Sequence, residues 1–335
     1  MAVVHFVQYS AAMSERPVEP ELKYEIGPAP SALKRTALER AFEALPLEQR
    51  GAAVDDLLAS VSRGERSLEG LFAAWRGDDV GGALWTERHA GRTAGIWPPQ
   101  LAAAAPEHLA DKLLAHALAE LESKNVAMVQ CLALTDASSD AQRLRRAGFE
   151  HSCDLLYLVS QKGSFPSTSA GADLTFVPVE PTKLDHLAKL VERTYEGTLD
   201  CPAMDRRADH RRDCRDVLEG YRATCRGDLS HWFVVLCGAE EVGCLLLACD
   251  DRGQSWELVY MGIVPAARGR GLGIELVRHA QWLVARRSGE RLVLAVDAAN
   301  EPALNIYAAA GFLAWDKRSV FLKFLSPSSD PLPTR

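Results

Sequence analysis

The sequence lacks several features that would assign it to a common functional class. It contains no uninterrupted apolar run of the roughly 20 residues that are needed to cross a bilayer. Residues 1–13 lack the basic start and long apolar stretch of a signal peptide. The eight cysteines include no Cys-x-x-Cys pair, and several lie within apolar runs, so we expect buried thiols and no metal site. These absences favour a cytoplasmic protein with no membrane partner.

An excess of basic residues is also missing. The formal net charge is −7, which disfavours a general nucleic-acid binder and is compatible with a cationic amine substrate. Residues 205–226 are rich in arginine, but acidic residues are interleaved with them. This alternation is typical of a solvated helix with ion pairs between successive turns. At 335 residues and 47% apolar, the chain can bury two cores of ordinary size.

The most informative stretch that is present is glycine-rich and runs from Val264 to Gly273, with the sequence VPAARGRGLG. The apolar run Leu258–Val264 predicts a strand before it, and the apolar spacing over 274–287 predicts a helix after it. Free backbone N–H groups at a helix N-terminus bind anions, and glycines let a diphosphate come close to the main chain. The stretch therefore predicts a site for a phosphate-bearing ligand.

Two common phosphate motifs do not fit this stretch. A Walker-type loop requires Gly-Lys followed by Ser or Thr, and the sequence contains no such loop. A dinucleotide fingerprint requires a third glycine where Ile274 stands. Both nucleotide-binding classes are thereby disfavoured.

Two blocks together resemble the GCN5-related N-acetyltransferase (GNAT) superfamily. Arg268-x-x-Gly271-x-Gly273, after a Val-Pro pair, is similar to that family's coenzyme-A loop. Residues 296–307, VDAANEPALNIY, with Ala310-Gly311-Phe312 after them, resemble the family's strand, helix and closing strand in order and spacing. The resemblance implies an α/β (α+β) fold with a mixed, mostly antiparallel central sheet flanked by helices. It also implies acetyl-CoA as the donor.

An internal repeat indicates two such domains in tandem. Ala147-Gly148-Phe149 recurs 163 positions later, and Val80-Gly81 recurs after 162 positions. We expect the last strand, Arg318–Phe324, to close the sheet of the second domain. The predicted organisation comprises an extension, a first domain, a linker, an active domain and a disordered tail: residues 1–19, 20–162, 163–172, 173–325 and 326–335.

The first domain has lost the glycine loop. Its positions that correspond to the motif carry Ala105, His108 and Ala110, and no glycine occurs between Gly95 and Gly148. We predict a degenerate domain that stabilises the second one or forms a wall of its substrate cleft. An alternative is that it binds a different ligand of its own.

The resemblance also implies how the cofactor is held. Pantetheine would lie between two diverging strands and bond to backbone groups near Met261, Ile263 and Val264, with an N–H near Val264 on the thioester carbonyl. The other predicted cofactor-binding residues are Arg268, Gly269, Arg270, Gly271, Leu272, Gly273, Asn300 and Asn305. Asn300 also reads as a helix N-cap before Glu-Pro, and the two roles are compatible.

Three side chains carry the predicted chemistry, each with an alternative. Tyr307 is the candidate general acid beside the coenzyme-A sulfur, or a packing tyrosine on a helix face. Glu257 is the candidate general base, which takes the amine proton through water, or an exposed edge carboxylate. Asp200 is the candidate anchor for a cationic amine, or an ordinary turn residue. His279 is expected on the helix surface.

The sequence therefore predicts an N-acetyltransferase that transfers an acetyl group from acetyl-CoA to a primary amine of a small molecule by direct attack in a ternary complex. Such a reaction needs no enzyme nucleophile and gains most of its rate from placing the two reactants and polarising the thioester. Two alternatives stay open. One is a non-catalytic acyl-CoA sensor or scaffold, and the other is an enzyme that acetylates protein lysines or N-termini. The acceptor, the acyl preference and the oligomeric state are not set by the sequence.

Overall fold

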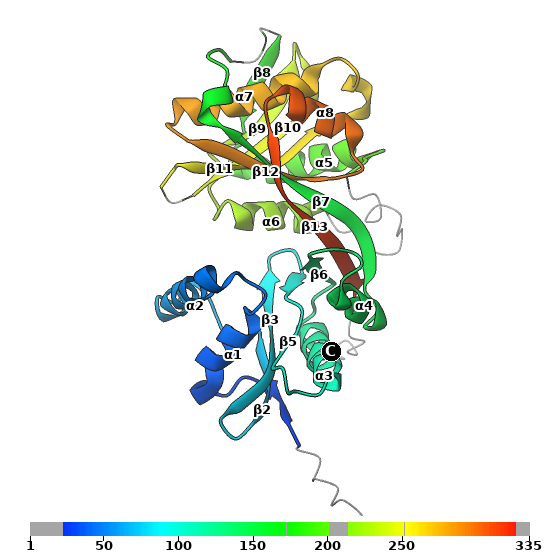
Figure 1. Ribbon diagram of the computed structural model, residues 1–335. Coiled ribbons are helices and arrows are strands. Elements are labelled where there is room, and N and C mark those ends of the chain that lie inside the picture. Colours follow the sequence, from blue (N-terminus) through cyan, green and yellow to red (C-terminus); the bar gives the residue numbers. More distant parts are fainter. Residues whose placement is uncertain (1–22, 170, 172, 201–213, 251, 326–335) are drawn as a thin grey trace, which may run out of the picture.

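The computed structural model describes residues 23–169, 171, 173–200, 214–250 and 252–325. It has two lobes, one above the other, joined by two long strands (Figure 1). The predicted extension 1–19, the predicted tail 326–335 and part of the arginine-rich segment (205–213) lie outside the described residues. No helix in the described part of the chain has the length and apolar character to cross a bilayer.

The lower lobe is formed by the first part of the chain. Its strands are β1 (Glu25–Pro28), β2 (Leu71–Arg76), β3 (Asp79–His89), β4 (Thr93–Ile96), β5 (Gln100–Leu101) and β6 (Met128–Ala133). Its helices are α1 (Lys34–Ala41), α2 (Leu47–Ser62), α3 (His108–Ser123) and α4 (Ser139–Arg146). Helices α1 and α2 pack on one face of the sheet and α3 on the other, each over its own apolar cluster.

The upper lobe repeats this order of elements. Its strands are β8 (Leu174–Pro178), β9 (Trp232–Cys237), β10 (Glu240–Cys249), β11 (Ser255–Ile263) and β12 (Arg291–Asp297). Its helices are α5 (Leu184–Tyr195), α6 (Cys214–Thr224), α7 (Leu272–Arg286) and α8 (Glu301–Ala309). Short 3₁₀ turns lie at Ser31–Leu33, Lys162–Ser164, Pro181–Lys183 and Pro265–Ala267. The fold is the mixed, mostly antiparallel sheet flanked by helices that the sequence predicted, and the repeated order confirms the tandem arrangement.

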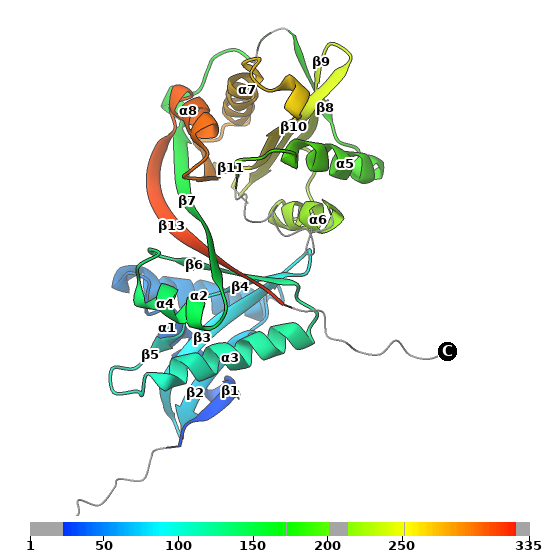
Figure 2. The same cartoon turned by 90° about the vertical axis from the view of Figure 1, so that its right-hand side faces the viewer.

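The final strands of the two halves are exchanged. Strand β7 (Glu150–Gln161), the last of the first half, pairs with β12 of the upper lobe. Strand β13 (Leu313–Phe324), the last of the second half, pairs with β6 of the lower lobe. The two strands also pair with each other, so one continuous sheet runs through both lobes, and Figure 2 shows them crossing between the lobes.

This exchange differs from the expectation that Arg318–Phe324 closes the sheet of its own half. Both final strands follow the same Ala-Gly-Phe signal and both are long enough to pair along two neighbours. Backbone pairing has little sequence specificity, so equivalent strands in a duplicated chain are able to change places. As a consequence, β7 of the first half lies beside β12 in the sheet of the upper lobe.

The sequence predicted His279 on the surface of α7, but in the structure its side chain is buried. Its imidazole ring stacks on Phe176 with 3.4 Å between ring centroids, and its Nδ1 lies 3.1 Å from the Ser169 hydroxyl. Burial lowers the pKa of His279 to about 4. The segment between the halves is thus packed against α7, where Gly171 also donates its N–H to Glu275.

Candidate active site

Strands β11 and β12 diverge in the upper lobe. They pair in parallel only at the start of β11, from Ser255 to Glu257. The remaining residues of β11 continue to pair with β10 on the other side as far as Ile263. An open edge therefore faces β12 along the second half of β11. Unpaired ladder groups at such an edge need hydrogen-bond partners, and an amide-bearing ligand is suited to supply them.

The register shows which backbone groups face this opening. Val264 donates its N–H to the carbonyl of Val242 at 3.0 Å, so it belongs to a hydrogen-bonded position with β10. Because such positions alternate along an antiparallel pair, the backbone groups of Ile263 and Met261 point to the β12 side. This corrects one expectation, since the N–H of Val264 is not free for a thioester carbonyl. A β-bulge at Val259, between Tyr260 and Leu258, further turns the strand here.

The glycine loop has the backbone of an anion cradle. Gly269 and Gly271 have φ values of 74° and 77°, which favour glycine, and nothing lies within 4 Å of a Cβ built at either residue. Helix α7 begins at Leu272, and its N-cap is Gly271. Gly271 has no side chain that could accept a hydrogen bond from the first N–H groups of the helix. Gly273 serves packing, because a Cβ there would lie 2.7 Å from Cδ1 of Ile306. The loop thus fits a diphosphate.

The two arginines of the loop have different surroundings. The guanidinium of Arg268 donates to three main-chain carbonyls, those of Ile263 (3.0 Å), Gly197 (3.2 Å) and Thr194 (2.8 Å). These hydrogen bonds connect the loop to the C-terminal end of α5 and hold its backbone in position. Arg270 is exposed, and its guanidinium forms an ion pair with the Glu240 carboxylate at 3.5 Å.

Helix α8 carries Tyr307, which lies near Asp200 at the end of β12. Asn300 is the N-cap of this helix and accepts the N–H of Ala303 at 3.3 Å, as the N-cap interpretation predicted. Tyr307 is buried, and its ring lies 5.6 Å from that of Phe312. Burial, with the nearby charge of Asp200, raises the pKa of Tyr307, so the phenol stays protonated at neutral pH. Asn305 lies on the exposed side of the helix.

Asp200 joins this group from the segment after α5. Its carboxylate accepts the backbone N–H of Asp297 at 3.0 Å, where β12 ends. Desolvation raises the pKa of Asp200. The hydrogen bond from the Asp297 N–H lowers this pKa, and the negative charge of Asp297 raises it. Asp200, Asp297 and Tyr307 thus lie together at the end of β12, although they are far apart in the sequence.

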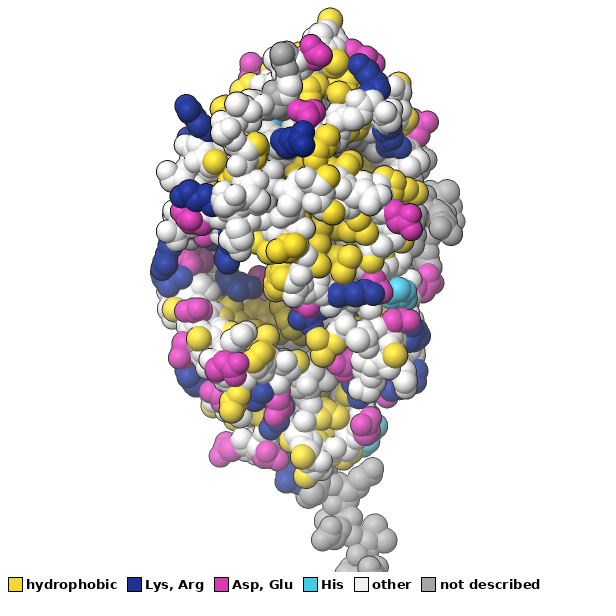
Figure 3. Space-filling view, turned by 45° about the horizontal axis from the view of Figure 1, so that its top comes forward, with side chains coloured by type: hydrophobic (Ala, Val, Ile, Leu, Met, Phe, Trp, Pro, Cys, Tyr) yellow, Lys and Arg dark blue, Asp and Glu magenta, His cyan; other side chains and the backbone are white. Residues whose placement is uncertain are grey.

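Glu257 stands where the two strands begin to separate, on the sheet face that α5 and α6 cover. Its side chain is exposed, as expected for an edge carboxylate, and partial desolvation raises its pKa. Its charge acts on the Tyr157 hydroxyl of β7 and on the Cys225 thiol after α6. A carboxyl group with a raised pKa is a better base at neutral pH. The space-filling view shows a hollowed region between the lobes, with apolar side chains on its floor (Figure 3).

A group of aromatic hydroxyls near the opening was missed by sequence reasoning. Tyr260 of β11 lies 2.7 Å from the Thr194 hydroxyl, and Tyr195 lies 2.6 Å from Tyr221. The rings of Tyr221 and Tyr260 stack with centroids 5.2 Å apart. These residues come from β11, α5 and α6, and no motif joins them. The only signal was the tyrosine within the predicted cradle strand.

The equivalent region of the lower lobe is built differently. There β4 stays paired with β6 along its whole length, Thr93–Ile96. Helix α3 begins at His108 with no glycine in the residues directly before it, whereas α7 follows Gly269 and Gly271. These features fit the expected loss of the cradle from the first half.

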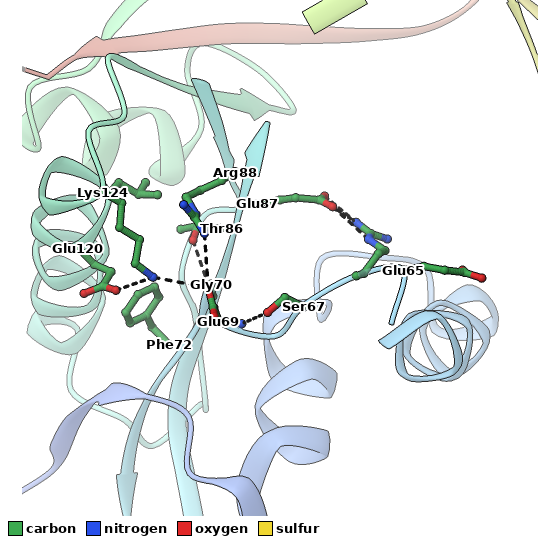
Figure 4. Close-up of a pocket in the computed structure, with 12 residues that line it drawn as sticks. Glu65, Ser67, Glu69, Gly70, Phe72, Thr86, Glu87, Arg88, Glu120 and Lys124 are labelled. Atoms are coloured by element: carbon green, nitrogen blue, oxygen red, sulfur yellow. Dashed lines mark hydrogen bonds and ion pairs between the residues drawn. The ribbon is translucent and has the colours of Figure 1, made fainter. Parts of the chain in front are cut away.

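Two cavities lie in the lower lobe, away from the glycine loop. One, of about 220 Å³, has a charged lining that includes Arg66, Arg88 and Lys124 (Figure 4). These cations pair with glutamates of the same lining, which leaves little charge for a ligand. The other cavity, of about 330 Å³, lies between β4 and β6 beside Trp97 and Leu132. No set of side chains suited to a metal ion occurs within the described residues.

Comparison with known proteins agrees with this geometry. Residues 190–312, which include the opening, the cradle and Tyr307, match the acetyltransferase (GNAT) family. A 65-residue segment is 34% identical to the mycothiol acetyltransferase of Renibacterium salmoninarum. That match covers 19% of this chain and 19% of the relative, so it spans about a fifth of the length of either protein.

Solved structures are similar over nearly the whole chain. A GCN5-related N-acetyltransferase from Sphaerobacter thermophilus superposes with a TM-score of 0.60 and 16% identity, covering 92% of this chain and 97% of the other. A tandem GNAT protein from the clavulanic acid biosynthesis pathway gives 0.51 and 14% identity, covering 92% and 100%. Residues 190–312 thus match the acetyltransferase (GNAT) family, and the chain as a whole has the fold of these solved structures.

Proposed function

We propose that the protein transfers the acetyl group of acetyl-CoA to a primary amine of a small molecule, in one ternary complex. The observation that supports the proposal is the opening between β11 and β12, since β11 is followed directly by the glycine cradle. The cradle would hold the diphosphate, and the edge of β11 at Met261 and Ile263 would bond the pantetheine amides.

Residues of the loop and of α8 would complete the donor site. The N–H groups of the first turn of α7, from Leu272 onward, would face the diphosphate, with Arg270 near its charge. Arg268 would keep the cradle in shape through its carbonyl contacts. Asn300 and Asn305 would flank the pantetheine side of the site. When bound, acetyl-CoA supplies a thioester carbonyl that an amine attacks.

Glu257 and Tyr307 would move the two protons of the reaction. An amine is protonated in solution, so Glu257 would accept its proton before the nitrogen forms the new C–N bond. As the C–S bond breaks, Tyr307 would give its proton to the leaving sulfur, which its raised pKa permits because the phenol stays protonated. Asp200 would add negative charge that attracts the ammonium group.

A free-thiol release assay with acetyl-CoA and a panel of small amines tests this function. Wild-type protein should release thiol only when an acceptor is present. Tyr307→Phe should bind acetyl-CoA normally and lower kcat by about 10²- to 10⁴-fold, the range of general acid catalysis. Glu257→Gln should lower kcat/KM and remove the acidic limb of its pH profile. Binding without turnover on any amine would favour the acyl-CoA sensor instead.

A further inference from the structure

Two aromatic side chains form a half-exposed platform beside Glu257. Trp315, the third residue of β13, is 62% exposed. Its ring lies 5.8 Å from that of Tyr157 on β7, with 57° between the ring planes. Leu313, on the same strand, is 72% exposed. Large apolar side chains grouped at the surface mark binding sites more often than isolated ones do.

The sheet register places this platform on the same face as the candidate base. Glu257 stands opposite Val293 of β12, which stands opposite Val159 of β7 and then Leu313 of β13. Tyr157 is two residues from Val159 and therefore points to the same face. In a flat sheet the Cα atoms of Glu257 and Tyr157 would be about 12 Å apart, and their side chains approach each other from there.

The platform exists because the final strands are exchanged. Tyr157 belongs to the first half of the chain and reaches the cofactor strands only because β7 pairs with β12. A bulge between Ala314 and Asp316 leaves Trp315 outside the strand pairing and turns its ring over Tyr157. Bulges frequently re-aim a side chain beside a functional site.

Charges of both signs act on the Tyr157 hydroxyl, those of Arg318, Asp316 and Glu257. Asp316 pairs with Arg318 at 2.9 Å, which neutralises both groups. The Glu257 carboxylate lies on the same sheet face as Tyr157, where its negative charge would attract a cation. Aromatic faces also attract cations and stack on flat apolar rings.

We propose that Trp315 and Tyr157 bind the flat apolar body of the acceptor, and that the acceptor is an arylalkyl primary amine. Its ammonium end would lie toward Glu257, and a linker of a few carbon atoms would join it to a ring on the platform. This inference rests on the proposed function and specifies the substrate class of the same site. It gives the first half a direct part in substrate selection, through Tyr157.

The experiment compares two amines that differ only in the ring, 2-phenylethylamine and ethylamine. The quantity measured is the ratio of their kcat/KM values in the thiol-release assay. The variants are Trp315→Ala, Trp315→Phe and, as a matched control, Leu134→Ala, which removes an equally exposed apolar side chain (66%) of the lower lobe. Because Trp315 is exposed, its replacement should leave the fold intact, which a thermal unfolding curve checks.

Trp315→Ala should lower the ratio by about 10- to 100-fold, the loss expected for one aromatic stacking partner with its buried area. Trp315→Phe should keep most of the wild-type ratio, and Leu134→Ala should leave it within twofold of wild type. A ratio that stays within twofold of wild type in Trp315→Ala would overturn the inference.

Calorimetric binding of 2-phenylethylamine in the presence of coenzyme A separates this inference from the proposed function. Binding that weakens in Trp315→Ala, in a protein that acetylates no amine, would support the platform while the enzymatic function fails. Turnover of other amines with no measurable binding of 2-phenylethylamine would support the function while the platform fails.

Discussion

Replacement of Gly271 by tryptophan should separate the stability of the loop from its ligand binding. Gly271 has a φ of 77°, in the left-handed region, and nothing lies within 4 Å of a Cβ built there. A tryptophan at this position would therefore strain the backbone without striking a neighbour in the free protein. Its indole would occupy the cradle at the start of α7, where the diphosphate is expected.

The two effects have different sizes. A non-glycine residue in the left-handed region costs about 1–2 kcal/mol of unfolding free energy. Loss of two charge-assisted hydrogen bonds, at about 1.5 kcal/mol each, weakens binding by at least about 100-fold. Gly64 offers a matched control, because its φ is 75° and its Cβ position is equally open, yet it lies in the lower lobe.

Denaturant unfolding and calorimetric titration with acetyl-CoA make the comparison. Gly271→Trp and Gly64→Trp should be destabilised by similar amounts, while only Gly271→Trp loses acetyl-CoA affinity. Wild-type affinity in Gly271→Trp would refute the assignment of the cradle. Equal loss of affinity in both variants would show that binding reports general stability instead.

Two further predictions concern the fold. Burial lowers the pKa of His279 from 6.5 to about 4, so in this pH range the unfolded chain binds a proton that the folded chain excludes. About 3 kcal/mol of unfolding free energy should therefore be lost as the pH falls from about 6.5 to about 4. Partial burial raises the pKa of Asp154, but hydrogen bonds from Lys317, Ser319 and His151 outweigh it and lower the pKa from 3.8 to about 2. A further loss of about 2 kcal/mol of unfolding free energy should therefore follow as the pH falls from about 4 to about 2. Unfolding curves of His279→Gln and Asp154→Asn should each lack one of these two phases, and persistence of both phases in either variant would contradict the assignment. Residues 173–325 expressed alone should not fold cooperatively, because β12 then lacks its partner β7 and β13 lacks its partner β6. Co-expression with residues 20–162 should restore folding. A stable monomeric fragment of residues 173–325 would argue against the exchange of strands.

The glycine loop and its flanking elements were predictable from local sequence. The strand, the loop and helix α7 are encoded within about thirty neighbouring residues, where apolar spacing and glycine positions act directly on the backbone. Asn300 likewise caps the helix whose first turn it precedes. The repeat was visible because a duplication preserves the order of such local signals.

Long-range choices were not predictable in the same way. Strands β7 and β13 carry similar patterns, and nothing in either strand specifies which β6-like neighbour it joins. Arg268 was expected at the cofactor, but the carbonyls that bind it come from the end of α5, over seventy residues away. The expected role of the Val264 N–H failed because the register with β10 decides which N–H groups are free.

Calorimetric titration of the wild-type protein with acetyl-CoA tests the central claim most directly. The account predicts saturable binding of one molecule per chain, because β11 separates from β12 in the upper lobe while β4 remains paired with β6 in the lower lobe. Binding of two molecules per chain would show that the first half has kept a working site. Absence of binding would contradict the assignment of the glycine loop and of the opening beside it.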